Sequence, residues 1–385
     1  MVSAAAKPAV SERPNNRPDY ILLSAVLALS AFGALMIFSV TRFGLERSNV
    51  VTTVSMERQL IFVTAGLIAM AGFSVIDYRN LRDYLPLIYG GMLVLLFAVF
   101  LFDPVKGARR WIPLGFFNLQ PSEFAKLATI LALAYLLSRE RETTLLPWKV
   151  IAQAIVLTLI PAVLIFGQPD LGTTLTFPFI VMVMLFGAGM RWRQFVAVVG
   201  GGALAVFVMF QVGILREHQL DRIKVFLDPS IDPQGIGYNL KQSKLAIGSG
   251  QIFGKGLFQG TQTNLSYVPE QETDFIFTAV GEQLGFVGGI LVLAVFLIVI
   301  WRLLVIAVHA QDKFGSLLVM GVAGMMMFHV FINIGMTIGI APVTGLPLPF
   351  LSQGGSFYMA MALSIGMANS VWLRRSRVRS ETFAS

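Results

Sequence analysis

Cysteine is absent from this chain of 385 residues, and charged side chains are scarce. Without cysteine there is no disulfide framework and no thiolate metal site. The three histidines lie far apart in the sequence, without the spacing of metal ligands. Charged residues make up only 13% of the chain, whereas a soluble domain carries about 25%. The composition therefore excludes a disulfide-stapled domain and is untypical of a soluble one.

Apolar residues are abundant instead, and they collect into runs long enough to span a bilayer. A helix of roughly 20 apolar residues crosses the hydrocarbon core and satisfies its own backbone groups. We therefore predict an all-α integral membrane protein with about ten transmembrane helices. The expected spans are residues 20–40, 59–76, 84–102, 123–138, 150–167, 171–189, 194–214, 275–301, 316–338 and 355–373.

The other segments divide the chain into one membrane domain and two tails. Residues 1–19 are polar and proline-rich, which predicts a disordered tail, and residues 374–385 predict a basic tail. Residues 20–373 form one polytopic domain, which a long loop at 215–274 interrupts. A loop of this length is more than a connector, and its Tyr238–Ile247 part has the apolar spacing of an amphipathic helix.

Lysine and arginine predict the orientation of the chain. The net charge of +8 does not call for nucleic acid, because basic residues hold the loops of membrane proteins on the cytoplasmic side. With the long loop set aside, basic residues are more frequent on the side of the two termini. We expect both termini in the cytoplasm and the long loop outside.

Three acidic residues mark the point where the long loop enters an apolar span. Glu270, Glu272 and Asp274 lie within the sequence VPEQETDFIF. Neighbouring carboxylates and partial burial raise the pKa of a carboxyl group, which suits a general base. Asp274 is the candidate for that role. The alternative is structural, because Thr273 or Asp274 has the side chain of a helix N-cap.

Basic residues collect in a second segment that is expected outside. Arg109, Arg110 and Lys126 suit phosphate binding, because guanidinium and ammonium groups bind phosphate oxygens. The alternative for the two arginines is contact with lipid headgroups. Glu123 and Lys126 are three residues apart, which predicts an ion pair on one helix face. Lys126 also lies inside an apolar run, which favours a position facing a polar cavity.

Two breaks between apolar runs complete the polar features on this side. Asp170 follows Pro169 directly before an apolar run, where it suits a helix N-cap. The functional alternative is a carboxylate that lines an outward cavity and pairs with Lys126 or holds a cation. Residues 341–355 contain PVTGLPLPF, which is too rich in proline for regular helix and predicts a re-entrant or surface segment.

Several of these segments closely resemble the SEDS family. They are GARRWIPLGFFNLQPSEFAKLA at 107–128, GQPDLGTT at 167–174, the run 226–289, and IGIAPVTGLPLPFLSQGGS at 338–356. The resemblance covers most of the chain and is closer to the elongation members than to the division members. It implies an inverting peptidoglycan glycosyltransferase of the bacterial cytoplasmic membrane that polymerises lipid II.

The resemblance also implies residue roles and partners. The essential aspartate of the family corresponds to Asp274, its functional lysine to Lys126, and its QPDLGT aspartate to Asp170. Glu272 and Gln353 depart from the commoner family pattern, which has histidine and tyrosine there. The implied partners are lipid II, membrane lipid, a class B penicillin-binding protein and the elongation machinery, with no nucleic acid.

The predicted site therefore faces outward and has Asp274 as its catalytic base. The predicted substrate-binding residues are Arg109, Arg110, Glu123, Lys126, Asp170, Glu270 and Thr273. A divalent cation, Mg²⁺ or Mn²⁺, is the one cofactor considered, its ligands are undetermined, and no organic cofactor is expected. Two alternatives stay open. The first is a lipid II flippase, which should carry charges at the middle of several spans. The second is a scaffold without catalysis, which does not explain why Asp274 should be a carboxylate.

Overall fold

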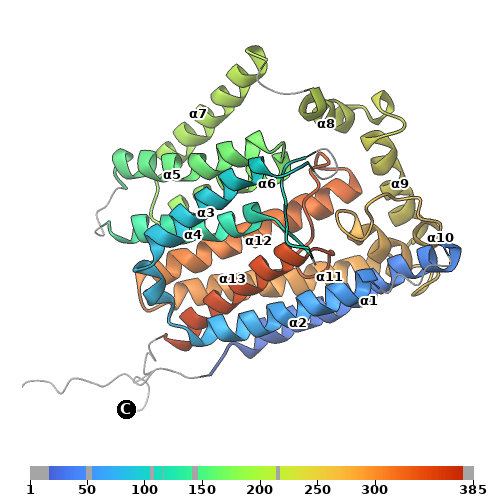
Figure 1. The fold of residues 1–385 in the computed structure, drawn as a ribbon, viewed down its shortest axis with the longest axis horizontal. Coiled ribbons are helices and arrows are strands. Elements are labelled where there is room, and N and C mark those ends of the chain that lie inside the picture. Colours follow the sequence, from blue (N-terminus) through green and yellow to red (C-terminus); the bar gives the residue numbers. More distant parts are fainter. Residues whose placement is uncertain are drawn as a thin grey trace, which may run out of the picture.

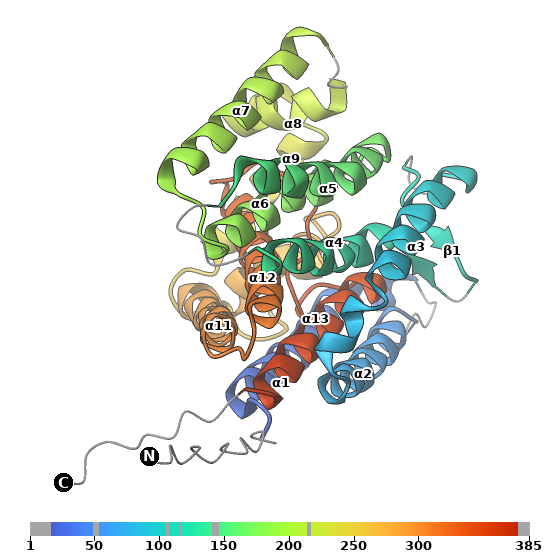
Figure 2. The same ribbon diagram turned by 90° about the vertical axis from the view of Figure 1, so that its left-hand side faces the viewer.

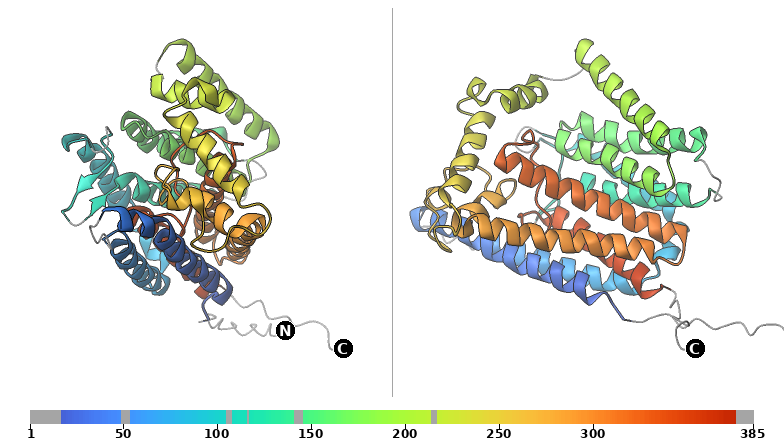
Figure 3. Two further views of the ribbon diagram at one scale, coloured as in Figure 1. Left: turned by 90° about the vertical axis from the view of Figure 1, so that its right-hand side faces the viewer. Right: turned by 180° about the vertical axis from the view of Figure 1, so that it is seen from behind.

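The computed structural model describes residues 17–48, 54–104, 108–115, 117–140, 146–213 and 217–375. Long helices lie side by side with a common tilt, and shorter helices cover one end of the bundle (Figure 1). The views from the side and from behind show the same arrangement (Figures 2 and 3). We call the covered end the loop end, because it carries residues 217–274. The opposite end, where the described chain begins and stops, is the termini end.

Ten helices form the bundle, and they confirm the predicted all-α membrane fold. They are α1 (Tyr20–Ser48), α2 (Val54–Val75), α3 (Leu85–Ala98, extended by η2, Val99–Leu101), α4 (Pro121–Ser138), α5 (Trp148–Gly167), α6 (Leu171–Gly187), α7 (Trp192–Gln211), α11 (Ile276–Val308), α12 (Lys313–Ile338) and α13 (Gly355–Leu373). Among the described helices, seven are long and apolar enough to cross a membrane, and two more are shorter and apolar. A helix suits hydrocarbon surroundings because it satisfies most of its backbone groups internally.

The helix α12 occupies the centre of the bundle, and α7 stands at its margin. α12 packs against α4, α6, α11 and α13, and most of its side chains are buried. Only 6% of the apolar stretch of α7 is buried, and Figure 1 shows this helix leaving the bundle at an angle. A helix that is apolar and exposed nearly all round has lipid as its surroundings.

Residues 217–274 fold into short helices rather than an open loop. They are α8 (Glu217–Leu227), η3 (Pro229–Ile231), α9 (Ile236–Ser249) and α10 (Thr261–Asn264). Figure 1 shows them as a column along the loop end. The helix α9 confirms the amphipathic helix expected at 238–247.

A break in α11 fastens this column to the bundle. Gly285 has a left-handed φ of 67°, which interrupts α11. The N–H groups of Lys255 and Gly256 donate to the carbonyl oxygens of Glu282 and Gln283, both at 3.0 Å. Hydrogen bonds from the loop thus satisfy carbonyl groups at the break. Irregular backbone within a membrane helix is tolerated when other parts of the protein satisfy its polar groups in this way.

The carboxylate of Glu282 strengthens this attachment. It is fully buried and lies 2.8 Å from Nζ of Lys255. It also accepts hydrogen bonds from the N–H groups of Gln262 (2.8 Å) and Thr263 (2.9 Å). A buried carboxylate is stable only with such partners. The chain that leads to residue 274 is therefore held against α11.

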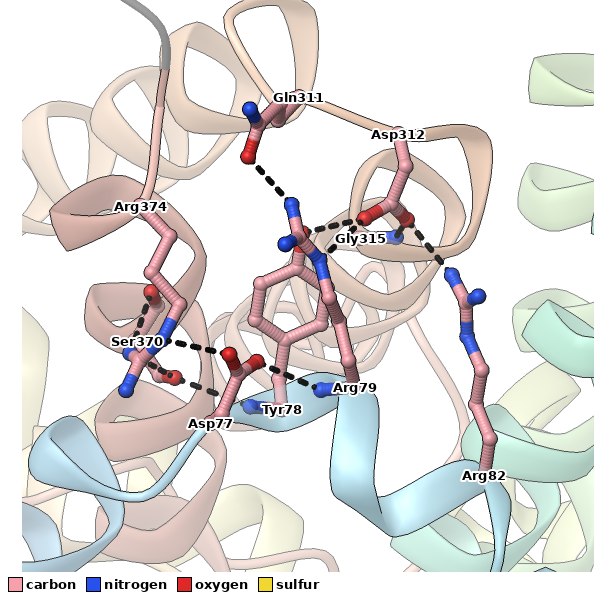
Figure 4. A network of polar contacts seen from close by, with 9 residues as sticks. All are labelled: Asp77, Tyr78, Arg79, Arg82, Gln311, Asp312, Gly315, Ser370 and Arg374. Carbon is pink, nitrogen blue, oxygen red and sulfur yellow. Dashed lines mark hydrogen bonds and ion pairs between the residues drawn. The ribbon is translucent and has the colours of Figure 1, made fainter. Parts of the chain in front are cut away.

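At the termini end, the carboxylate of Asp312 joins α12 to a short helix between α2 and α3 (Figure 4). Asp312 is the N-cap of α12, and three of its partners lie on that short helix, η1 (Tyr78–Arg82). Its donors are Tyr78 Oη (2.6 Å), Arg79 Nε (3.0 Å), Arg82 Nη2 (2.9 Å) and the N–H of Gly315 (2.8 Å). Burial by itself raises the pKa of Asp312, but these hydrogen bonds and positive charges outweigh it and hold the pKa below its usual value.

Asp19 corrects the predicted boundary of the N-terminal tail. Its side chain is 1% exposed and forms an ion pair of 2.6 Å with Arg302 of α11. Its N–H donates to Oδ1 of Asn369 at 3.0 Å. Because a buried carboxylate needs such partners, the ordered chain begins before α1. The rest of the predicted tails, residues 1–16 and 376–385, lies outside the described residues.

The Asp312 contacts predict a stability change at the termini end. Asp312→Asn removes the negative charge that its arginine partners require, so the free energy of unfolding should fall by about 1–3 kcal/mol. The wild-type contribution is present above the pKa of the unfolded chain and disappears as pH falls through the lowered pKa of the folded protein. Thermal unfolding of the purified protein in detergent, followed as a function of pH, measures both effects.

The matched control for this change is Asp221→Asn. Asp221 is about half exposed and forms an ion pair with Lys224 at 3.6 Å on the same short helix. Exposed pairs of this kind contribute little, so the unfolding temperature should stay close to that of the wild type. Equal unfolding temperatures for Asp312→Asn and the wild type would contradict the prediction.

Candidate active site at the loop end

A cavity of about 460 Å³ opens at the loop end, where segments distant in sequence meet. A hairpin of β1 (Ile112–Pro113) and β2 (Asn118–Leu119) supplies one part of the wall. The starts of α4, α6 and α13 and the segments that precede α11 and α13 supply the rest. Its polar lining includes Arg110, Gln120, Glu123, Asp170, Thr173, Glu270, Thr273, Asp274 and Gln353. Four carboxylates therefore share one cavity with an arginine.

A second hollow, of about 580 Å³, lies against α9. Its lining carries Lys241 and Lys244 but no aspartate, glutamate or histidine. It has no group that accepts a proton near neutral pH, so its greater volume does not make it the better candidate for an active site.

Asp274 reaches the first cavity from the turn that precedes α11. The N-cap of α11 is Phe275, without a capping hydrogen bond from a side chain, so the capping alternative for Thr273 and Asp274 is wrong. The backbone holds Asp274 instead. Its N–H donates to the carbonyl of Glu270 (3.1 Å), and its carbonyl accepts from Nδ2 of Asn333 (2.8 Å). The carboxylate of Asp274 is therefore not used to cap α11.

The surroundings of Asp274 raise its affinity for a proton. Burial raises the pKa of Asp274 to about 6, the negative charge of Glu270 adds to the rise, and Arg222 opposes it. Arg222 lies on α8 and donates from Nη1 to the carbonyl of Thr344 at 2.8 Å. This arginine was not predicted from the sequence, because only the folded loop brings it close to Asp274. A carboxyl group with such a pKa is suited to general base catalysis.

Gly345 is required where the proline-rich segment passes Asp274. Its φ is 74°, in the left-handed region that favours glycine. A Cβ atom at this position would lie 3.0 Å from Oδ2 of Asp274. Any other residue would therefore strain the backbone and press on the carboxylate.

Asp170 is both a helix cap and a part of the cavity wall. It is the N-cap of α6 and accepts hydrogen bonds from the N–H (3.2 Å) and Oγ1 (3.0 Å) of Thr173. It also lines the cavity, where its Oδ1 lies 3.9 Å from Nη1 of Arg110. The structural and the functional interpretations of this residue are therefore compatible. Its cationic neighbour is Arg110 rather than Lys126.

The two adjacent arginines have different surroundings. Arg110 lines the cavity and donates from Nη2 to the carbonyl of Pro169 at 2.5 Å. Arg109 is exposed and lies outside the cavity lining, with Nη1 at 3.3 Å from the carbonyl of Phe100. The structure thus favours Arg110 for contact with a substrate and leaves Arg109 facing outward.

Lys126 lies beneath the cavity rather than in it. Its side chain is 0% exposed, and its Nζ lies 2.8 Å from Oε2 of Glu123, which confirms the predicted ion pair. The same Nζ lies 2.9 Å from Nε2 of His329. His329 was not expected here, because 203 residues separate it from Lys126 in the sequence. Lys126 therefore acts on the cavity through Glu123, which lines it.

The two departures from the family pattern contact each other. The N–H of Gln353 donates to the carbonyl of Glu272 at 2.8 Å. Gln353 lines the cavity and Glu272 does not. This hydrogen bond joins the two segments that precede α11 and α13.

The described residues do not form a metal site of their own. None of their histidines and carboxylates gather into a group of three or more that could hold an ion. Mg²⁺ is commonly held by one or two carboxylates together with the phosphates of a substrate. The divalent cation considered from the sequence stays a prediction.

Comparison with known proteins shows the family to which the chain belongs. The family of FtsW, RodA and SpoVE, described as "Cell cycle protein", matches residues 20–376. The chain belongs to this family. It is the SEDS family that the sequence motifs resemble, so that prediction is confirmed.

Individual relatives cover nearly the whole chain. One is the probable peptidoglycan glycosyltransferase FtsW of Trichlorobacter lovleyi, 37% identical over 353 residues, with 91% of each chain covered. Another is the peptidoglycan glycosyltransferase RodA of Treponema pallidum, 34% identical over 428 residues, with 93% of this chain and 98% of the relative covered.

A solved structure has the same fold. It comes from work on "structural coordination of polymerization and crosslinking by a peptidoglycan synthase complex". It matches with a TM-score of 0.77 and 31% identity, and the match covers 92% of this chain and 97% of that one.

The buried ion pair beneath the cavity predicts a stability change. Glu123→Gln leaves the ammonium of Lys126 without its counter-charge, which should cost about 3–5 kcal/mol of unfolding free energy. The double variant Glu123→Gln with Lys126→Met removes both charges and should recover a large part of the loss. Thermal unfolding of the single and double variants in detergent measures the coupling, and a double variant that is no more stable than Glu123→Gln would contradict it.

Proposed function

We propose that this protein is a peptidoglycan glycosyltransferase that joins lipid II units into glycan strands. Its relatives carry that activity in their names, and they cover more than nine-tenths of this chain. The surplus of lysine and arginine on the side of the termini supports an orientation with both termini in the cytoplasm. The cavity at the loop end then faces the outside of the bacterial cytoplasmic membrane, where lipid II is polymerised.

The position of Asp274 carries this proposal. Its carboxylate faces a cavity that also holds Arg110, and its pKa is about 6. As a general base, Asp274 takes the proton from the 4-hydroxyl of an acceptor sugar. The oxygen attacks the anomeric carbon of the donor, the bond to the undecaprenyl diphosphate breaks, and the configuration inverts. The positive charge of Arg110 stabilises the negative charge that develops on the leaving diphosphate.

The distribution of charge favours this enzyme over a flippase. In the described membrane helices, every aspartate, glutamate, lysine and arginine lies within about two turns of a helix end. A carrier of charged headgroups should have charged residues at the middle of several spans. The charges here collect at the two ends, and the cavity with its carboxylates opens at one of them.

Membership of the elongation branch and a crosslinking partner belong to the same proposal. The relatives include both a division protein, FtsW, and RodA, at similar identity. The resemblance of PVTGLPLPF and of the run 226–289 to elongation members therefore supports the assignment to elongation. The structural neighbour comes from work on a synthase complex that coordinates polymerisation with crosslinking, which supports a class B penicillin-binding protein as partner.

A change of one atom at Asp274 tests the reaction. Asp274→Asn keeps the shape of the side chain but removes the base, so glycan synthesis should fall by at least about 100-fold. The assay supplies labelled lipid II to the complex with its penicillin-binding partner, with crosslinking blocked, and follows glycan ladders. The matched control is Glu272→Gln, two residues away and outside the cavity lining, which should keep wild-type activity.

Two outcomes would count against this proposal. Normal polymerisation by Asp274→Asn removes the base from the mechanism. A wild-type complex that moves lipid II between leaflets and makes no polymer favours the flippase.

The pH dependence of the rate tests the proton affinity of Asp274. A general base works in its unprotonated form, so the rate should rise as pH increases through about 6 and level off above it. Glu270→Gln removes the negative charge that helps to raise this pKa, so the rising limb should move to lower pH. Rates of glycan synthesis from pH 5 to 8 provide the measurement. A profile that is flat across pH 6, or one that Glu270→Gln leaves in place, contradicts the assignment.

A further inference from the structure

A histidine and a lysine form a buried pair beneath the candidate active site. Nε2 of His329 lies 2.9 Å from Nζ of Lys126, and both side chains are 0% exposed. The ring of Phe357 covers the pair, with its centre 4.9 Å from that of the imidazole and 5.5 Å from Nζ. Neither His329 nor Lys126 lines the cavity, so neither contacts a substrate bound there.

The other ring nitrogen decides where the hydrogen of His329 lies. Nδ1 is 3.1 Å from the carbonyl oxygen of Pro347, an atom that can only accept. Nδ1 must therefore carry the hydrogen. A neutral imidazole has one such hydrogen, so Nε2 presents a lone pair to the ammonium of Lys126, which can only donate. His329 is thus an acceptor for Lys126 and a donor to Pro347.

The buried pair contacts two residues of the cavity wall, Glu123 and Pro347. Lys126 lies between Nε2 of His329 and the carboxylate of Glu123, at 2.9 and 2.8 Å, and Glu123 lines the cavity. Pro347 lines it as well. Two acceptors at these distances fix the ammonium in place, so the negative charge of Glu123 keeps its counter-charge directly below the cavity.

Asn333 repeats the pattern one turn further along α12. Its Nδ2 donates to the carbonyl oxygens of Asp274 (2.8 Å) and Leu346 (2.7 Å). The same face of α12 therefore holds the base and the proline-rich segment, and His329 extends this support to Lys126.

Building on the proposed function, we propose that His329 is a positioning residue for binding of the lipid diphosphate. Through Nε2 it holds Lys126 against Glu123 and keeps that carboxylate neutralised when the anionic substrate enters. If Lys126 turns away, Glu123 adds an uncompensated negative charge to the wall and repels the diphosphate. Asp274 keeps its own attachment to Asn333, so the loss falls on substrate binding more than on the chemical step.

Two substitutions separate the two ring nitrogens. In His329→Gln the amide oxygen reaches the place of Nε2 and accepts from Lys126. In His329→Asn the amide nitrogen takes the place of Nδ1 and donates to Pro347, and Lys126 has no acceptor. We expect His329→Asn to raise the KM for lipid II by about tenfold or more with a smaller change in kcat, and His329→Gln to keep KM within about threefold.

The measurement uses the complex with its penicillin-binding partner, and thermal unfolding is recorded in parallel. A variant that only loses folded protein shows a lower kcat at unchanged KM, and that result for His329→Asn overturns the proposal. Equal KM changes for His329→Asn and His329→Gln also overturn it. A wild-type complex without polymerase activity overturns the proposed function instead.

A spectroscopic readout tests the arrangement without any activity. The chain has three histidines, so ¹⁵N labelling of the imidazoles gives few signals, and His329→Gln identifies the one of interest. We expect the nitrogen shifts of a neutral ring with hydrogen on Nδ1, and a change at Nε2 in Lys126→Met. Shifts that show hydrogen on Nε2, or on both nitrogens, overturn the assignment.

Discussion

The confinement of four carboxylates in one cavity is the constraint on which this site depends. Charge of one sign in a partly dehydrated space is unfavourable unless each group is neutralised, hydrogen-bonded or protonated. Asp170 has Arg110 and the start of α6, and Glu123 has Lys126. At Asp274, burial and the negative charge of Glu270 outweigh the opposing charge of Arg222, and its pKa rises to about 6. Asp274 can therefore take a proton near neutral pH.

The fold holds these carboxylates together by building the cavity from segments that are far apart in the sequence. The helix α12 runs through the centre and holds the proline-rich segment from one side through His329 and Asn333. On another side, the hydrogen bonds to the carboxylate of Glu282 fix the folded loop to α11, close to its break. The termini end is tied separately, through Asp312 and Asp19, and takes no part in the cavity. The contacts that tie the termini end are therefore separate from those that build the cavity.

Much of this organisation could be predicted from the sequence, because apolar runs of helical length have one stable form in a bilayer. The membrane helices, the amphipathic helix of the loop and the Glu123–Lys126 pair depend on local spacing and were predicted correctly. The positions of Lys126 below the cavity, of Arg222 beside Asp274, and of His329 depend on contacts between distant segments. A lone histidine in an apolar span has no local pattern that would reveal its lysine. The same holds for Asp19, whose partner Arg302 is 283 residues away.

The proline-rich segment takes part in this site mainly through its main chain. Three of its carbonyl oxygens, those of Thr344, Leu346 and Pro347, are held by Arg222, Asn333 and His329. A stretch that forms neither helix nor sheet keeps such oxygens available for outside donors. Exchange of its side chains, Gly345 apart, therefore leaves these three bonds possible. Substitutions of the donor residues on α8 and α12 should therefore disturb the site more than substitutions within the proline-rich segment.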